Sequence, residues 1–220
     1  MTSSLKAYLK TILSGELPGN KAHQKLLPPG RILRVPETDR NLVTQSSVLV
    51  LLFPENGKLY TCLTKRPSTM KNHPGQISFP GGKVEQEDES AECTALREAQ
   101  EEVGIRPSQI EILGKLSDFY LEVSRFTIQP FLAWCDSQPF FEANNNEVDE
   151  LILFPISDFV VDEQIRETQL QTVTGMLRIK YFPYEGHVVW GATAMILAEL
   201  IEILKQSELF EALRYDTFEK

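Results

Sequence analysis

The stretch that decides the fold covers residues 79–105 and reads FPGGKVEQEDESAECTALREAQEEVGI. Its second half carries apolar residues at helical spacing, which predicts an α-helix over residues 89–103. That apolar stripe consists of Ala91, Ala95, Leu96, Ala99 and Val103. Gly104 follows at the position where a glycine commonly ends a helix. Ahead of the helix, Pro80, Gly81 and Gly82 predict a sharp bend whose backbone can approach a ligand closely.

Three acidic side chains share one face of the predicted helix. Glu98, Glu101 and Glu102 fall within a single turn. Like charges at this spacing destabilise a helix, and the C-terminal half of a helix disfavours anions. In one interpretation they form a solvated face on which Arg97 pairs with Glu101. In the other they bind a divalent cation, because Mg²⁺ and Mn²⁺ prefer hard oxygen ligands. On these residues alone both interpretations stay open.

The bend and the helix together resemble a known motif. Gly82, Glu89 and the run from Arg97 to Ile105 are similar to the Nudix box, G-x5-E-x7-R-E-U-x-E-E-x-G-U, in which U is aliphatic. This chain has one more residue between the glycine and the first glutamate. The resemblance implies an α/β fold, the Nudix-type α/β/α sandwich with a mixed central sheet. It also implies a hydrolase that cuts a phosphoanhydride bond with the help of Mg²⁺ or Mn²⁺.

The same resemblance implies roles for single residues. The implied metal ligands are Glu98, Glu102, Glu101, the carbonyl of Gly82 and, from a separate loop, Glu147. The implied catalytic residues are Glu98, Glu101 and Arg97. Among these, Glu98 is one candidate for the general base, and Arg97 orients a carboxylate of the box. Glu89 is expected to pin the preceding loop to the helix. For Glu147, a solvated acidic turn is the alternative interpretation.

A second resemblance concerns the substrate. Residues 63–82 read LTKRPSTMKNHPGQISFPGG and are similar to L-[L]-T-[KR]-R-[SA]-x3-R-x3-G-x3-F-P-G-G, the motif of the coenzyme A diphosphatase-like branch of the Nudix hydrolases. Pro67 and Lys71 depart from that motif. Residues 189–194 also resemble a segment of this branch. The implied reaction cleaves the pyrophosphate of coenzyme A or its derivatives into 4′-phosphopantetheine and adenosine 3′,5′-bisphosphate.

The residues expected to bind this substrate gather in the same segment. They are Lys65, Arg66, Lys71, Gly75 and Gly81, and His73 adds to the basic patch. Two alternatives stay open. One is a Nudix hydrolase that acts on ADP-ribose, a nucleoside triphosphate or a dinucleotide polyphosphate. The other is a non-catalytic domain that senses such a ligand.

Composition limits the partners. The chain has 31 acidic and 22 basic side chains and a net charge of −9, which argues against nonspecific binding to nucleic acids. A polyanionic small molecule therefore needs a local basic patch. Cys62, Cys93 and Cys135 are widely spaced and odd in number, which argues against a disulfide framework. The start resembles no secretory signal, and no run of about 18 apolar residues is present. We expect a cytoplasmic protein without membrane association.

The remaining sequence gives the organisation. We expect a short helix and an extended, proline-rich connector in residues 1–40, and the Nudix domain in residues 41–220. An apolar run over residues 47–53 and a second strand over residues 59–64 predict a hairpin around the turn at residues 54–57. Further strands are expected at residues 110–113, 126–134 and 148–154, with a hairpin over 172–182. An apolar helix over residues 190–204 leaves room for a homodimer.

Overall fold

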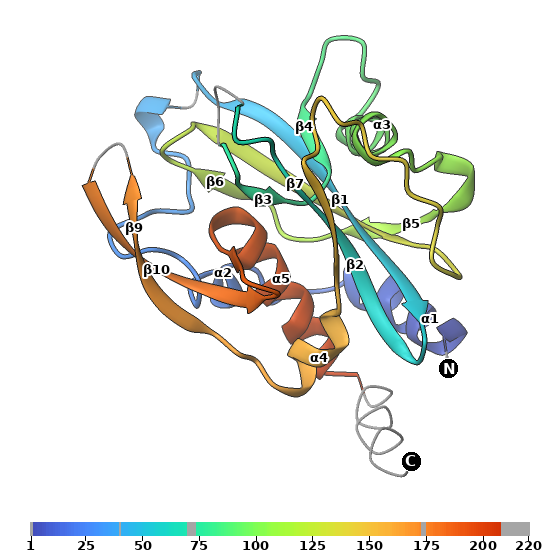
Figure 1. Ribbon diagram of the computed structural model, residues 1–220. Helices are drawn as coiled ribbons and strands as arrows, with labels where there is room; N and C mark the ends of the chain where they lie inside the picture. The colour runs from blue at the N-terminus through green and yellow to red at the C-terminus, as the bar shows by residue number, and fades with distance from the viewer. Residues whose placement is uncertain (1, 40, 70–73, 173–174, 208–220) are drawn as a thin grey trace.

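The computed structural model describes residues 2–39, 41–69, 74–172 and 175–207, and a mixed sheet lies at its centre (Figure 1). Strand β1 (Thr44–Glu55) pairs in parallel with β7 (Phe126–Trp134) and antiparallel with β2 (Lys58–Lys65). The other strands of this sheet are β3 (Ile77–Ser78), β4 (Gly81–Lys83), β5 (Glu111–Lys115), β6 (Phe119–Leu121) and β8 (Glu150–Phe154). Strands β3 and β8 pair with β2, β4 pairs with β1, and β5 and β6 pair with β7.

The predicted hairpin between β1 and β2 is confirmed. Both strands run further than expected, so that only Asn56 and Gly57 connect them. Their φ angles are 49° and 77°. Positive φ at both central residues is what a tight two-residue hairpin turn requires, and asparagine and glycine tolerate it best.

Helices cover both faces of the sheet, which confirms the predicted sandwich of helix, sheet and helix layers. Leu49, Leu51 and Phe53 of β1 pack in one core cluster with α3 (Ala91–Val103). Val50 and Leu52 point the other way, into a cluster that contains α5 (Gly191–Lys205). Figure 1 shows α3 and α5 on opposite sides of the sheet. A strand buried on both faces needs an unbroken apolar run, which residues 47–53 supply.

The N-terminal residues pack against the same domain. Helix α1 (Thr2–Leu13) is followed by the short helix α2 (Gly19–His23) and a 3₁₀ turn, η1 (Glu37–Asp39), where we expected an extended connector. Leu5, Leu9 and Leu26 are buried in the core cluster that contains α5. The division of the chain near residue 40 stays a prediction.

A buried polar pair joins α2 to α5. His23 and Glu199 both have fully buried side chains, and His23 Nε2 lies 3.1 Å from Glu199 Oε2. The same carboxylate accepts hydrogen bonds from the backbone N–H groups of Gly19, at 3.2 Å, and of Ser117, at 3.2 and 3.3 Å. A buried carboxylate needs such donors to offset its lost hydration. Helix α2 is therefore held in place by charge as well as by apolar contact.

The C-terminal third adds a second sheet and the last helix. Strands β9 (Arg166–Thr172), β10 (Gly175–Tyr184) and β11 (His187–Val189) form a three-stranded antiparallel sheet. The hairpin predicted over residues 172–182 is wrong in its bounds, because its two strands, β9 and β10, extend from Arg166 to Tyr184. Strand β9 was missed because its side chains are polar and show no apolar alternation. Eleven of the fifteen residues of α5 are buried within the chain. This helix therefore gives no support to a homodimer, which stays a prediction.

The short helix α4 (Ile156–Val161) connects β8 to the second sheet, and Phe159 stacks on Phe154. Across the described ranges, no helix combines the length and the apolar character needed to cross a lipid bilayer.

Candidate active site

Helix α3 carries the acidic cluster and has defined signals at both ends. Ser90 caps the first turn and accepts a hydrogen bond from the N–H of Cys93 at 3.2 Å. Gly104 ends the helix with a φ of 74°, the left-handed conformation that glycine adopts without strain. The predicted helix is confirmed to within two residues at its start. Its apolar stripe packs against β1, and Glu98 of the acidic face lies against Gly82 of the bend that precedes the helix.

The two glycines of the bend allow the backbone to pass between β1 and α3. Gly82 pairs with Ser47 of β1, and a Cβ atom at position 82 would collide with the carboxylate of Glu98. A Cβ atom at Gly81 would collide with the backbone of Ser47 and Val48. A side chain at position 81 would therefore displace the sheet, whereas one at position 82 would displace the carboxylate of Glu98. The structure thus brings Gly82 directly against Glu98, as the proposed metal site requires.

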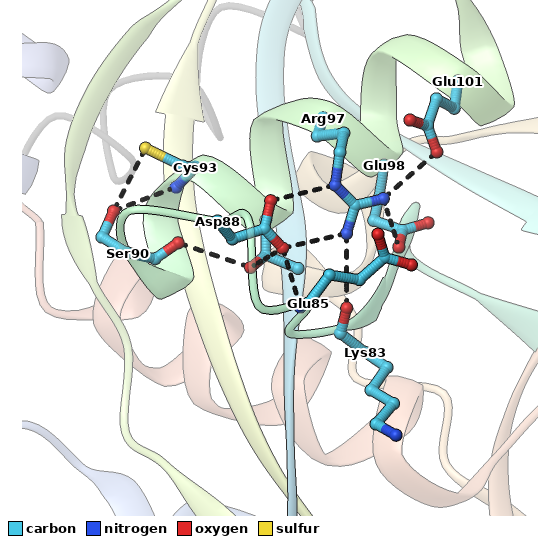
Figure 2. Close-up of polar contacts among 9 residues, drawn as sticks. Lys83, Glu85, Asp88, Ser90, Cys93, Arg97, Glu98 and Glu101 are labelled. Carbon is cyan, nitrogen blue, oxygen red and sulfur yellow. Dashed lines mark hydrogen bonds and ion pairs between the residues drawn. The ribbon is translucent and has the colours of Figure 1, made fainter.

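Arg97 organises the acidic face (Figure 2). Its Nη1 donates to Glu98 Oε1 at 2.9 Å and to Glu101 Oε2 at 3.2 Å. On the other side, Nε and Nη2 donate to the two carboxylate oxygens of Asp88, each at 3.0 Å. Nη2 also donates to the carbonyl of Lys83 at 3.3 Å. A guanidinium can satisfy all these acceptors because its five N–H donors lie in one rigid plane.

Asp88, and not Glu89, pins the loop to the helix. Glu89 is exposed, whereas Asp88 also accepts hydrogen bonds from Thr94 Oγ1 at 2.8 Å and from the backbone of Glu85 at 3.0 Å. Its hydrogen bonds with Arg97, first among these contacts, hold the pKa of Asp88 well below its usual range. The sequence signal was present, since Asp88 lies at the motif's own five-residue spacing from Gly82. The additional residue therefore falls between Asp88 and the helix.

Removing this contact should weaken the fold. We expect Asp88→Asn to lower the free energy of unfolding by about 1–2 kcal/mol, because a charge-assisted pair becomes a neutral one. A depressed pKa contributes stability above the ordinary pKa, near 4, and this contribution is lost as the pH falls. The difference from the wild type should therefore shrink in acid. Urea unfolding at pH 7 and at pH 3.5 measures it. Glu89→Gln is the matched control, and equal effects of the two changes would refute the assignment.

Glu102 is the most unusual side chain of the cluster. It is only 3% exposed, and its Oε2 has no hydrogen-bond partner among the described residues. Burial, followed by the nearby charge of Glu98, raises the pKa of Glu102 to about 8, although Arg66 and the backbone of Gly81 oppose the shift. Burial also raises the pKa of Glu98. A buried carboxylate beside a partly buried one is costly unless a cation joins them.

The donor set fits a hard divalent cation, but the carboxylates are not gathered around one point. No group of three or more His, Cys, Asp or Glu side chains in the described part of the chain is arranged to hold a metal ion as it stands. The reason is visible in the contacts, since Glu98 and Glu101 both turn to Arg97. The unpartnered oxygen of Glu102, whose carboxylate lies near Glu98 and the backbone of Gly81, is the position where a cation would relieve the electrostatic cost.

Glu147 reaches the cluster from a separate loop. Its charge contributes to the raised pKa values of both Glu98 and Glu102, which places the three carboxylates near one another. Asn144 Nδ2 donates to Glu147 Oε1 at 3.3 Å. Sequence spacing alone could not show this proximity, because it arises from the path of the chain between β7 and β8. The role of Glu147 as a ligand stays a prediction.

The predicted substrate residues are only partly brought together. Lys65 is engaged in an ion pair with Glu150 at 3.1 Å, so a phosphate there would have to compete for it. Arg66 is half-buried, lies near Glu102, and has an Nε without a hydrogen-bond partner in the part of the chain described. Gly75 is exposed and donates its N–H to the Arg66 carbonyl at 3.2 Å. Lys71 and His73 lie outside the described residues.

The sequence did not predict that His187 lies near the expected substrate residue Lys65. His187 of β11 lies with its Nε2 3.1 Å from Glu150 Oε1, so Glu150 contacts both His187 and Lys65. A lone histidine far along the chain carries no sequence signal for such a contact.

Comparison with known proteins points to one family. The profile described as NUDIX domain matches residues 43–174, more than half of the chain. Peroxisomal coenzyme A diphosphatase NUDT7 of Mus musculus is 34% identical over 174 residues, which cover 75% of this chain and 72% of that protein. Nudix hydrolase 15, mitochondrial, of Arabidopsis thaliana is 33% identical over 168 residues, 73% of this chain. The match spans only 59% of the length of this plant relative.

Solved structures agree on the fold. A Nudix hydrolase from M. smegmatis, RenU, matches with a TM-score of 0.51 and 18% identity, covering 73% of this chain and 84% of that one. At this identity the likeness speaks for the fold alone. The profile match and the mouse relative, which is covered over more than two thirds of its length, are stronger evidence. The chain therefore belongs to the NUDIX family, whose members are pyrophosphohydrolases.

Proposed function

We propose that this chain is a hydrolase that depends on Mg²⁺ or Mn²⁺ and cleaves the pyrophosphate of coenzyme A or its derivatives. The products would be 4′-phosphopantetheine and adenosine 3′,5′-bisphosphate. The observation that carries the metal-dependent chemistry is the buried, unpartnered carboxylate oxygen of Glu102, near Glu98 and the backbone of Gly81. The similarity to a mouse coenzyme A diphosphatase supports this choice of substrate.

The metal would be held by the carboxylates of the cluster and the bend before it. Its ligands would be Glu98, Glu102, Glu101, the carbonyl of Gly82, and Glu147. When bound, a divalent cation neutralises charge on the diphosphate and lowers the pKa of an attacking water. Because Glu98 and Glu101 are paired with Arg97, their recruitment has to compete with that guanidinium.

The chain's own side chains supply orientation and proton transfer. Asp88 fixes Arg97, and Arg97 fixes Glu98 and Glu101, so the acidic face is oriented from the loop side. Water attacks one phosphorus atom, the bond from that phosphorus to the bridging oxygen breaks, and each product keeps a phosphomonoester. The proton of the water passes to a base, for which Glu98 is the candidate, and burial raises the pKa of this carboxyl.

The remaining predicted residues would bind the anionic parts of the substrate. Arg66 lies close enough to Glu102 to oppose its pKa shift, so its guanidinium is near the reacting diphosphate in this proposal. Lys65 and Lys71 would add positive charge, and Gly75 and Gly81 would allow close approach of the backbone. This local patch is what an acidic protein needs to attract a polyanion. A cytoplasmic location is part of the same proposal.

A substrate panel tests the proposal. Purified protein is incubated with coenzyme A and either Mg²⁺ or Mn²⁺, and adenosine 3′,5′-bisphosphate and 4′-phosphopantetheine are measured by mass spectrometry. We expect both products in equal amounts and a higher kcat/KM for coenzyme A than for ADP-ribose, nucleoside triphosphates or dinucleotide polyphosphates. Faster cleavage of ADP-ribose would overturn the choice of substrate. Metal binding without cleavage of any of these compounds would favour a ligand-sensing domain.

A further inference from the structure

The loop over residues 141–149 is fixed to the end of the acidic helix. Glu142 N–H donates to the carbonyl of Val103 at 2.9 Å, and Asn144 N–H donates to the carbonyl of Glu102 at 2.9 Å. Carbonyl groups in the last turn of a helix have no partner within the helix, so they are available to such a loop. One of the two belongs to Glu102 itself. The backbone of the loop is thus fixed directly to Glu102, the residue at the centre of the proposed site.

The far end of the loop is fixed as well. Val148 is buried in the core cluster that contains α3, and Asp149 N–H donates to the carbonyl of Lys65 at 2.8 Å. The segment between Asn144 and Val148 therefore spans from α3 to the end of β2. Glu147 lies on this short, doubly anchored span, so its backbone position is determined by both elements.

Asn144 makes the contacts that shape this span. Its Oδ1 accepts from the N–H of Asn146 at 3.2 Å, and its carbonyl accepts from the N–H groups of Glu147 and Val148 at 2.9 and 2.8 Å. Its Nδ2 donates to Glu147 Oε1 at 3.3 Å. One residue therefore connects the backbone of Glu102 to the side chain of Glu147. A neutral amide stabilises a carboxylate among like charges without adding a charge of its own.

We propose that Asn144 is a positioning residue that aims the carboxylate of Glu147 at Glu98 and Glu102, and so completes the site for the divalent cation. The inference rests on the metal site of the proposed function. The hydrogen bond from Asn144 occupies one oxygen of Glu147 and orients the other. When a residue that hydrogen-bonds to a metal ligand is replaced, metal affinity or activity commonly falls by about 10- to 100-fold.

Manganese binding by the full chain tests this without relying on turnover. The signal of free Mn²⁺ in electron paramagnetic resonance gives affinity and stoichiometry for each variant. We expect Asn144→Ala to weaken Mn²⁺ binding about tenfold. Asn144→Asp keeps the oxygen that accepts from Asn146 but removes the donor to Glu147, and should weaken binding as well. Asn145→Ala, at the exposed neighbouring asparagine, is the matched control and should bind as the wild type does.

A double-variant comparison separates positioning from general loop damage. In a background of Glu147→Gln, the further change Asn144→Ala should have no additional effect on Mn²⁺ affinity, because the group that it positions has already lost its charge. A full additional loss in that background would overturn the proposal. Wild-type affinity in both Asn144→Ala and Asn144→Asp would overturn it too.

The outcome is distinguishable from a failure of the proposed function. If the wild type binds Mn²⁺ and Asn144→Ala weakens that binding while coenzyme A is not cleaved, the proposed substrate fails and the positioning role stands. If the wild type cleaves coenzyme A and Asn144→Ala binds Mn²⁺ normally, the positioning role fails alone. If the wild type does not bind Mn²⁺ at all, both are overturned.

Discussion

Replacing Glu102 by glutamine should reduce metal-dependent hydrolysis at least about a thousandfold, because a metal that neutralises the transition state contributes several kcal/mol. Glutamine has nearly the same volume and keeps one carbonyl oxygen, so the packing beneath Gly81 should survive. Glutamine lacks the negative charge that would bind the cation. Turnover of coenzyme A under saturating Mg²⁺ measures the effect, and Glu87→Gln in the exposed part of the preceding loop is the control. Activity within tenfold of the wild type would refute the role of Glu102.

The same substitution should have the opposite effect on the metal-free fold. A carboxyl whose pKa is raised to about 8 in the folded state contributes stability below its ordinary pKa, and this contribution is lost as the pH rises toward 8. Glutamine avoids that loss. With chelator present, we expect Glu102→Gln to be more stable than the wild type at pH 8.5 by about 1–3 kcal/mol. The difference in the free energy of unfolding between the variant and the wild type should be smaller at pH 5. Lower stability of the variant at both pH values would contradict the raised pKa.

Glu199→Ala should lower the free energy of unfolding by about 3–5 kcal/mol. It removes the shared acceptor of three donors: the N–H groups of Gly19 and Ser117, and Nε2 of His23. Burial alone would raise the pKa of Glu199, but the hydrogen bonds from His23 and Ser117 outweigh it and hold the pKa below its ordinary value. The carboxylate is therefore charged at neutral pH, and its donors would be left without a partner.

Glu202 supplies the matched control, because it lies on the same helix and also pairs with a basic side chain. Its side chain is 29% exposed, and its partner Lys25 lies at 2.7 Å near the surface. Solvent screens such a pair, so Glu202→Ala should cost at most about 1 kcal/mol. Urea unfolding of both variants at neutral pH makes the comparison. Similar losses in the free energy of unfolding for the two variants would show that the buried carboxylate of Glu199 stabilises the fold no more than a partly exposed one.

The parts of the fold that sequence could predict are those with a local signal. The apolar run of β1 and the Asn56-Gly57 turn predict the first hairpin, with bounds correct to within a few residues. The apolar stripe of α3 and the glycine at its end predict this helix with similar precision. Strand β9 could not be found in this way, because an edge strand with polar side chains has no apolar alternation to detect. Helix α2 is too short to show periodicity, so the proline-rich composition around it suggested extended chain.

The site shows the same limit. The proximity of Glu98 and Glu102 follows from helical geometry and could be predicted. The contact of Asp88 with Arg97 could also have been predicted, because Asp88 and not Glu89 has the five-residue spacing from Gly82. The approach of Glu147 depends on contacts between separate elements. No spacing rule connects Asn144 to the carbonyl of Glu102, and only the folded chain brings them together.

The place of α5 has a practical consequence for work with truncated forms. The profile match ends at residue 174, and α5 begins at Gly191. Yet the side chains of this helix, together with Leu5 and Leu9 from the opposite end of the chain, belong to the core cluster on one face of the sheet. A fragment trimmed to residues 43–174 would lack these segments and would expose the apolar face of the sheet to solvent. Expression trials that keep both flanking segments should yield monodisperse material where the trimmed fragment aggregates.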